Sequence, residues 1–376
     1  MLRPSDLGFM PSRAPTRYGV EEVRGRAAFD ALASAWNGLL SRGPVDLPMV
    51  RHEWIAAWLD AFAPEAEPLV LVARGPAGEL AGLAPFLAER RRGVARLLAP
   101  ANDHSCRYEW ALGPDASAAV GALWAHLRDR MRWDVLLLRD VPRDGPTSTL
   151  LEPLARADGH LTGRWESMRS PWVDLGGGPA EARTSAKFRS NLRRRSRKLQ
   201  EAGAVSLRRA DRPEDVDGAL AEFLALEASG WKGRRGTAIA LDRRLVAFYA
   251  RIARDAAARG ALAVRILDLD GRGVAVHLGM VHRGVYYLPK TAYDEGLGHA
   301  SPGQLLQSEV LAECEARGLS RFDFLGPDMD WKREWAPSHA PHDWLYVYRP
   351  SLRGSVMHTL KHRVRPVVKE ALSWWR

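Results

Sequence analysis

The feature that most constrains the fold is a pattern of elements that occurs twice along the chain. Residues 68–87, PLVLVARGPAGELAGLAPFL, and residues 261–281, ALAVRILDLDGRGVAVHLGMV, each contain two apolar runs around a turn with glycine. Glycine tolerates the positive φ that tight hairpin turns need, so each stretch predicts a β-hairpin. A chain that repeats such a unit is expected to fold into two related halves.

The elements that follow each hairpin also correspond. Apolar residues at helical spacing predict one helix over 116–131 and another over 301–318, where Ser301 is expected to be the N-cap. Each helix precedes a short apolar strand that carries an aspartate, and the two aspartates are expected at equivalent places. The strands and their aspartates are 131–141 with Asp134 and 319–329 with Asp323.

The repeat predicts an α/β (α+β) protein with two domains, each a mixed central sheet flanked by helices. At 376 residues the chain is also longer than most single hydrophobic cores. The glycines of VDLGGGPAEA favour a boundary between the halves. The expected division is an N-terminal tail at 1–17, a first domain at 18–165, a linker at 166–183, a second domain at 184–350, and a basic, Trp-ended tail at 351–376.

Charge and composition narrow the class of protein. A net charge of +10 predicts attraction to nucleic acid, anionic lipid or phosphate-bearing small molecules. Two cysteines are too few for a disulfide framework or a Cys-rich zinc site, and no metal is expected. The sequence has no P-loop, no Gly-x-Ser-x-Gly nucleophile elbow and no His-Glu-x-x-His motif. These absences disfavour, in turn, a P-loop NTPase, a hydrolase with a serine nucleophile elbow and a zinc protease.

The sequence contains no segment typical of a signal peptide and no apolar run approaching the roughly 20 residues that span a bilayer. We therefore expect a cytoplasmic protein. The basic tail from Ser351 favours either packing against the second domain or contact with an anionic membrane surface at the inner face.

A basic stretch, SAKFRSNLRRRSRKLQEAG at 185–203, carries seven positive side chains between Lys187 and Lys198. Its spacing predicts a helix beginning near Thr184 or Ser185, with an apolar seam of Phe188, Leu192 and Leu199. Arg189, Arg193 and Arg197 then share a polar face. That face is interpreted either as a solvated surface or as a site for an anion.

Several stretches together resemble a known family. FRSNLRRRSRKLQEAG, ASGWKGRRGTAI, YLPKTAYDEGLGHASPGQLL and FDFLGPDMDWKREW are similar to the second half of tandem GNAT-like acyltransferases associated with cellulose and exopolysaccharide biosynthesis. This group is related in fold to the Fem-type peptidoglycan aminoacyltransferases. The first half, with HEWIAAWLDAF and its hairpin, also fits, so the resemblance covers about 20 to 350. It implies two GNAT domains, the first degenerate and the second catalytic.

The resemblance implies a site for the pyrophosphate of acyl-CoA at the start of the predicted helix 301–318. Backbone N–H groups and the helix dipole favour phosphate at such a terminus. The residues expected there are Gly298, His299, Ser301, Gly303 and Gln304. The stretch departs from the family signature, because Pro302 donates no N–H and the loop has no arginine. The alternative is an ordinary helix start.

Direct acyl transfer needs a base for the attacking amine and groups that stabilise the oxyanion and the leaving thiolate. Asp323 is the candidate base, because aspartate is rare in strands and its burial without a partner costs free energy, which suggests a specific role. Lys290 is expected to hold a phosphate or carboxylate, and Tyr293 to protonate the thiolate. The alternatives are an Asp323 that anchors its strand and a loop with a Lys290–Asp294 pair.

Two tryptophan–lysine pairs are candidate substrate contacts, because Trp offers a flat apolar wall and Lys a point charge. Core packing of the tryptophans is the alternative. The residues expected to bind substrate are Arg189, Arg193, Trp231, Lys232, Asp294, Trp331 and Lys332.

The leading hypothesis is an N-acyltransferase that uses acyl-CoA, as acetyl-CoA or a longer thioester, to modify an amine or hydroxyl of a polysaccharide precursor or another envelope-related acceptor. A second hypothesis keeps the chemistry but takes the group from aminoacyl-tRNA, the one nucleic acid expected as a partner. A third is a non-enzymatic protein that binds polyanions or an anionic membrane.

Overall fold

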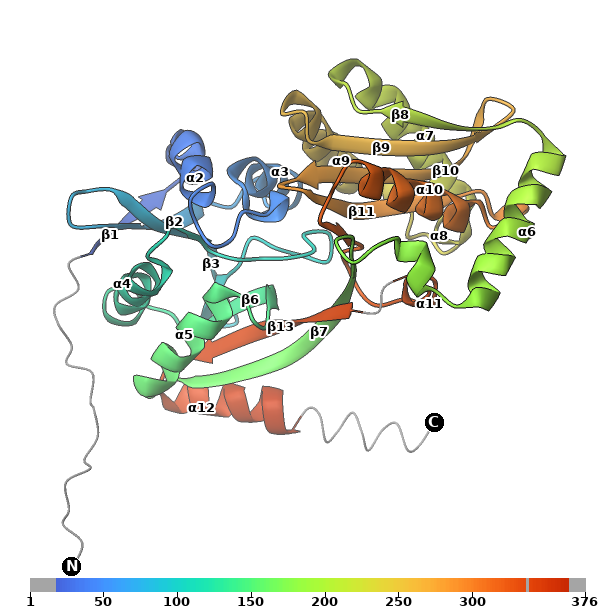
Figure 1. The fold of residues 1–376 in the computed structure, drawn as a ribbon. Helices are drawn as coiled ribbons and strands as arrows, with labels where there is room; N and C mark the ends of the chain where they lie inside the picture. The colour runs from blue at the N-terminus through green and yellow to red at the C-terminus, as the bar shows by residue number, and fades with distance from the viewer. Residues whose placement is uncertain (1–17, 336–337, 365–376) are drawn as a thin grey trace, which may run out of the picture.

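The computed structural model describes residues 18–335 and 338–364. The predicted N-terminal tail, 1–17, and part of the predicted C-terminal tail, 365–376, lie outside these ranges. One mixed sheet runs through the molecule (Figure 1). Its strands in the first half are β1 (Gly19–Arg24), β2 (Pro68–Arg74), β3 (Leu80–Arg91), β4 (Val94–Leu98), β5 (Ala111–Leu112), β6 (Val135–Pro142) and β7 (Leu161–Asp174). Those in the second half are β8 (Val205–Ala210), β9 (Leu262–Leu269), β10 (Arg272–His282), β11 (Val285–Tyr293), β12 (Arg321–Asp323) and β13 (Ser338–Tyr348).

The order of strands confirms that the two halves are related. Neighbours follow β1-β2-β3-β4-β6-β13-β7-β12-β11-β10-β9-β8, with β5 off this path beside β3. Counted inward from either edge of the sheet, the strands of the two halves follow the same order. In each half the first neighbours are antiparallel and the last two strands form a parallel pair, which is β4–β6 in the first half and β11–β12 in the second. The predicted repeat is therefore a repeat of topology, and the two sheets that we expected are joined into one.

The two halves exchange their last strands at the centre of this sheet. β13 pairs with β6 of the first half, and β7 pairs with β12 of the second, while β7 and β13 pair with each other along most of their length. The predicted linker at 166–183 is wrong over residues 166–174, because these residues belong to β7. Their backbone pairs with β13 up to Trp172 and with β12 from Trp172 to Asp174. The glycines that follow Asp174 form the connection instead.

Helices cover both faces of the sheet. In the first half they are α1 (Arg26–Ala31), α2 (Ala33–Leu40), α3 (His52–Phe62), α4 (Ala116–Asp129) and α5 (Pro146–Ala157). In the second they are α6 (Ala186–Ala202), α7 (Val216–Ser229), α8 (Trp231–Arg234), α9 (Arg243–Ala258), α10 (Pro302–Ala316), α11 (Asp330–Arg333) and α12 (Leu352–Thr359). No helix in the described ranges is long and apolar enough to cross a membrane.

Strand residues alternate between the two faces, as a pleated strand requires. In β9, Val264 and Ile266 pack with α3, α7 and α9, whereas Ala263 and Leu267 pack with α6 and α10 on the other face. The helices α4 and α5 cover that second face in the first half. Each half thus has its own helix after the hairpin, α4 or α10, on the same side of the sheet.

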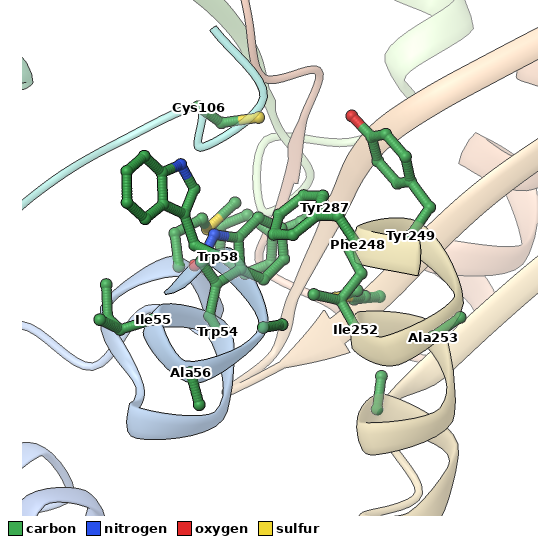
Figure 2. Close-up of a cluster of buried hydrophobic side chains, with 14 of the residues drawn as sticks. Trp54, Ile55, Ala56, Trp58, Cys106, Phe248, Tyr249, Ile252, Ala253 and Tyr287 are labelled. Carbon is green, nitrogen blue, oxygen red and sulfur yellow. The ribbon is translucent and has the colours of Figure 1, made fainter. Parts of the chain in front are cut away.

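The two halves also meet through helices α3 and α9, which lie side by side (Figure 2). The rings of Trp54 and Phe248 pack edge to face with centroids 5.5 Å apart. Such aromatic pairs add to the energy of apolar burial. The core therefore continues from one half into the other.

The local predictions for the second half are confirmed at several elements. The turn of its hairpin has positive φ at Asp270 and Gly271, 50° and 77°. Helix α6 begins as expected, because the Ser185 hydroxyl accepts a hydrogen bond from the Phe188 N–H at 3.1 Å. Phe188, Leu192 and Leu199 are its buried residues.

The expected equivalence of Asp134 and Asp323 is wrong. Val135 of β6 and Arg321 of β12 start the two parallel pairings. Asp134 therefore precedes its strand, where its carboxylate accepts the Ala95 N–H at 2.8 Å, whereas Asp323 ends its strand. The two strands carry an aspartate for different structural reasons.

Candidate functional site

The parallel strands β11 and β12 separate where the candidate site begins. They pair only from Val285 to Tyr287, opposite Arg321 to Asp323. Beyond Asp323 the chain leaves the sheet, while β11 continues to Tyr293 and keeps β10 as its neighbour. Within the described residues, the second part of β11 thus has a strand on one edge only, and its other edge is available to a ligand with amide groups.

A cavity of about 400 Å³ lies between α6, the first turn of α10, and α11. Its basic residues, Lys187 and Arg195, make no hydrogen bond or ion pair with any other residue that the structure describes. Of its acidic residues, Asp330 is paired with Arg333 at 2.8 Å. The lining residues are Ser185, Lys187, Phe188, Asn191, Arg195, Gln304, Asp330, Trp331 and Glu334.

Gln304 is the predicted donor-binding residue that lines the cavity. The Gln304 amide donates to the Trp331 carbonyl oxygen at 3.2 Å and accepts a hydrogen bond from the Trp335 indole. Gly303 lies under the ring of Tyr293, which a Cβ there would touch at 3.3 Å. Gly298 and His299 are exposed before the helix and do not line this cavity.

Ser301 was expected to cap α10 through its side chain, and it does not. Its backbone is left-handed, with a φ of 48°, and its hydroxyl donates to the Gly298 carbonyl oxygen at 3.1 Å instead of accepting from the helix. The helix starts with Pro302 at its first position, as predicted. Of the amide groups in the first turn, the Gly303 N–H has no partner among the described residues. Pro302 has no N–H, and the Gln304 N–H donates to the Ser301 carbonyl oxygen at 3.0 Å.

The structure changes which residues of α6 are candidates for a phosphate. Arg189 donates to the carbonyl oxygens of Ala182 and Thr184, so its guanidinium stabilises the start of its own helix. Arg193 is exposed and does not line the cavity. Lys187 and Arg195, which we did not predict, do line it. The spacing of eight residues between them was the available signal, because it places both on one face of a helix.

Lys290 lies on β11 beyond the point where the strands separate, and its side chain is partly buried. Its ammonium is 5.5 Å from the centre of the Tyr249 ring, and no acceptor among the described residues is within hydrogen-bonding distance. Burial and the nearby charge of Lys232 lower its pKa. A cation in this setting is suited to an anionic ligand or a developing oxyanion.

Lys332 is buried near Lys290. Its ammonium donates to the carbonyl oxygens of Leu325 at 2.6 Å and Pro327 at 2.9 Å. Burial lowers its pKa to about 8. The preceding residue of α11, Trp331, lines the cavity, so this short helix connects the cavity with the lysines. Trp331 forms part of the cavity wall, while Lys332 holds the loop after β12.

The other predicted tryptophan–lysine pair is on α8. Lys232 forms an ion pair with the buried Glu227 at 2.6 Å, and Glu227 also accepts the Ile239 N–H at 2.8 Å. Trp231 is 41% exposed, with the guanidinium of Arg235 5.3 Å from its ring centre. Trp231 therefore presents an apolar surface to solvent and is not a core residue.

The loop after β4 brings two further residues to Lys290 from the first half. His104 Nδ1 is 2.9 Å from the Tyr249 hydroxyl, and burial together with Lys290 lowers the pKa of His104 to about 4. Cys106 is buried with a φ of 64°, and burial raises the pKa of its thiol. Figure 2 shows its sulfur above the layer of Trp58 and Tyr287. The sequence carries no local signal that links these residues to Lys290, because the contact is between the halves.

Asp323 is an ion-paired residue. It is 1% exposed, one of its oxygens accepts from Arg107 at 2.7 Å, and the other accepts the Leu325 N–H at 2.9 Å. Arg107 comes from the loop after β4 and also donates to His342 Nε2 at 3.0 Å. This geometry favours the alternative that Asp323 anchors the strand, and it leaves neither oxygen directed at an acceptor amine.

The structure does not bring Lys290 and Tyr293 together. β11 is regular between them, so residues three apart lie on opposite faces of the sheet. Lys290 faces α9, and Tyr293, 40% exposed, faces α10. Asp294 forms an ion pair with Arg272 at 2.6 Å and accepts the Gly296 N–H, so the Lys290–Asp294 pair of the alternative interpretation is absent from the described residues.

Comparison with known proteins agrees with this arrangement of strands. Residues 186–333 match the family model of the acetyltransferase (GNAT) domain. They include β11, the first turn of α10, and the lysines of the candidate site. This half is therefore a GNAT-like domain, and the first half repeats its order of strands. No curated protein matches the chain.

Solved structures share the fold over nearly the whole chain at low sequence identity. FemX aligns with a TM-score of 0.58 and 13% identity, over 90% of this chain and 99% of its own. The C-terminal domain of a proposed lysylphosphatidylglycerol synthetase from Agrobacterium fabrum aligns with a TM-score of 0.52 and 12% identity, over 88% and 97%. A conserved protein from Bacteroides thetaiotaomicron aligns with a TM-score of 0.52 and 11% identity, over 85% and 97%.

Proposed function

We propose that this protein is an acyltransferase that moves an acyl group from acyl-CoA to an amine. The observation that carries the proposal is the unpaired edge of β11, which runs from Lys290 to the first turn of α10 and the basic cavity beside it. A long donor with phosphates at one end and a reactive thioester at the other fits such a path.

The cavity supports binding of the phosphate end. Lys187 and Arg195 supply positive charge that no described residue pairs with. The start of α10 adds the helix dipole and the N–H of Gly303. The free edge of β11 supports binding of the amide-containing arm, because its backbone groups need partners. Trp331 and Gln304 would hold the donor from the side of α11 and α10.

Lys290 supports the chemistry at the thioester end. Attack by a neutral amine forms a C–N bond and places a negative charge on the carbonyl oxygen. The Lys290 ammonium is suited to stabilise that charge, because burial strengthens the interaction and no described acceptor competes for it. Collapse of the intermediate breaks the C–S bond, the amine proton passes to a base, and the thiolate leaves. Because Tyr293 lies on the opposite face of the sheet from Lys290, we assign it no role in this step.

The acceptor that we propose is an amine or hydroxyl of a polysaccharide precursor or another envelope-related molecule. The exposed Trp231, with Arg235 beside it, supports an acceptor that combines an apolar or sugar face with negative charge. The resemblance of the sequence to acyltransferases of exopolysaccharide biosynthesis supports the same class.

A second candidate donor is aminoacyl-tRNA. Beyond the cavity, α6 carries further exposed cations, Arg193, Arg197 and Lys198, that no described residue neutralises. A row of this length exceeds what one pyrophosphate requires and suits a polyanion. Binding of tRNA would fall steeply with salt, whereas binding of CoA in the cavity would fall less.

A thermal-shift titration tests the leading proposal. Free CoA, acetyl-CoA and longer acyl-CoAs should raise the melting temperature in a saturable way, since a ligand that binds only the folded state stabilises it. Arg195→Ala should reduce this rise. Lys290→Met should retain most of the rise and lose at least tenfold in the rate of thiol release with an amine acceptor.

Arg243→Ala is the matched control, because Arg243 is exposed at the start of α9 and does not line the cavity. It should behave as the wild type. No shift with any CoA compound would reject acyl-CoA as the donor. Salt-sensitive binding of charged tRNA by the same protein would then support the second candidate.

A further inference from the structure

An apolar stripe covers the outer side of α12 and of the helical turn that follows it, Leu360–Val364. Eight large apolar side chains are exposed among the described residues, and four of them belong to this stripe. Their spacing of four residues keeps them on one side of the helix. They are Leu352 at 85%, Val356 at 49%, Leu360 at 56% and Val364 at 43% exposure.

The inner side of α12 is fixed to the sheet, so the helix cannot turn its apolar stripe inward. The Ser351 hydroxyl accepts the Gly354 N–H at 3.0 Å and caps the helix. Arg353 donates to the Gly93 carbonyl oxygen at 2.7 Å, which joins α12 to the turn between β3 and β4. His362 Nε2 lies 3.1 Å from the Tyr348 hydroxyl of β13.

A groove of about 520 Å³ lies between α12 and the β3–β4 hairpin. Aromatic and aliphatic side chains from β13, β4, β6 and α12 form its floor, and basic side chains form its rim. The lining residues are Arg91, Arg92, Val94, Arg96, Val135, Tyr346, Tyr348, Met357, Leu360 and Lys361. The groove is continuous with the stripe, because Leu360 belongs to both.

Positive charge surrounds the stripe and the groove. Arg90, Arg91 and Arg92 are exposed at the hairpin tip, and no residue within the described ranges pairs with them. The segment 352–364 contains no acidic residue. The acidic groups beside this surface are already bound, since Glu89 pairs with Arg96 and Asp134 accepts the Ala95 N–H.

We propose that α12 and the β3–β4 hairpin form a surface that binds anionic lipid bilayers, with the stripe inserted among the acyl chains and the arginines at the phosphate groups. An amphipathic helix with apolar and basic sides lies in the plane of such a bilayer. A second copy of this chain is a poorer partner, because a symmetric contact would bring together two surfaces that both carry unpaired arginines. The proposal does not depend on the identity of the acyl donor.

Co-sedimentation of the full chain with vesicles tests the proposal. The protein should sediment with vesicles that contain phosphatidylglycerol and stay in the supernatant with phosphatidylcholine alone. Leu352→Ser/Val356→Ser/Leu360→Ser should abolish sedimentation without loss of the folded state, since these side chains are exposed. Arg91→Gln/Arg92→Gln should weaken it on the order of tenfold.

Arg42→Gln/Arg243→Gln is the matched control, since it removes two exposed charges that no described residue pairs with and that lie in neither the stripe nor the groove. It should sediment as the wild type does. Three results would overturn the proposal: no sedimentation with phosphatidylglycerol, a serine variant that sediments unchanged, or a wild-type dimer that this variant converts to a monomer without any lipid binding.

Discussion

At the scale of single residues, Glu109 shows how burial sets the charge of a side chain. It is 2% exposed, and one oxygen accepts the Thr147 N–H at 3.0 Å. The other oxygen has no hydrogen-bond partner among the described residues. Burial raises the pKa of Glu109 from an ordinary 4.5 to about 8, so the folded protein holds a proton there at neutral pH.

The raised pKa predicts that Glu109 makes stability fall as the pH rises. Between pH 4.5 and 8 the folded state binds this proton and the unfolded state has released it. The free energy of unfolding then decreases by about 1.4 kcal/mol per pH unit across that window from this group alone. Glu109→Gln should remove this part of the slope. Urea denaturation of both proteins at several pH values measures it, and parallel profiles would contradict the prediction.

At the scale of elements, the Arg107–Asp323 ion pair joins the loop after β4 to the end of β12. Arg107→Met should destabilise the protein by roughly 3–5 kcal/mol, because Asp323 would remain buried without its cation. Arg107→Met/Asp323→Leu should recover much of the loss, since replacement of a whole buried pair by apolar groups is often neutral.

Chemical denaturation of the single and double variants measures this coupling. If Arg107→Met has the stability of the wild type, the pair does not anchor β12. Thiol release with an amine acceptor adds a second test: a double variant that folds and keeps its rate would exclude Asp323 as the base.

Elements with a local cause were predictable from the sequence. The hairpin turn at Asp270–Gly271 and the start of α6 at Ser185 depend on a few neighbouring residues, and both are confirmed. The opposite faces of Lys290 and Tyr293 were also readable, because an odd spacing in a strand separates side chains. Lys187 and Arg195 were missed, since only the packing of α6 on α10 shows which face of α6 lines the cavity.

Contacts between the halves were beyond prediction from one sequence. The approach of His104 and Cys106 to Lys290 depends on how the loop after β4 meets β11 and α9. The exchange of β7 and β13 is likewise a property of the complete sheet. Local propensity carries no information about which of two similar strand partners is chosen.

At the scale of the whole molecule, the exchange predicts a single cooperative unfolding transition. β6 lies beside β13, and β12 beside β7, so neither half has a complete sheet without the other. Differential scanning calorimetry of the full chain should give one transition with equal calorimetric and van't Hoff enthalpies. A fragment ending at residue 174 should not form a stable monomer. Two resolved transitions, or a folded fragment, would contradict this expectation.

The exchange of last strands also affects how the protein is made. A ribosome releases β6 long before β13, because roughly half of the chain lies between Pro142 and Ser338. During that interval β6 has an open edge in the nascent chain, and open edges invite pairing with other chains. The sheet of the first half is therefore completed only after β13 has been synthesised. Chaperones that shield strand edges during translation are expected to raise the yield of native protein.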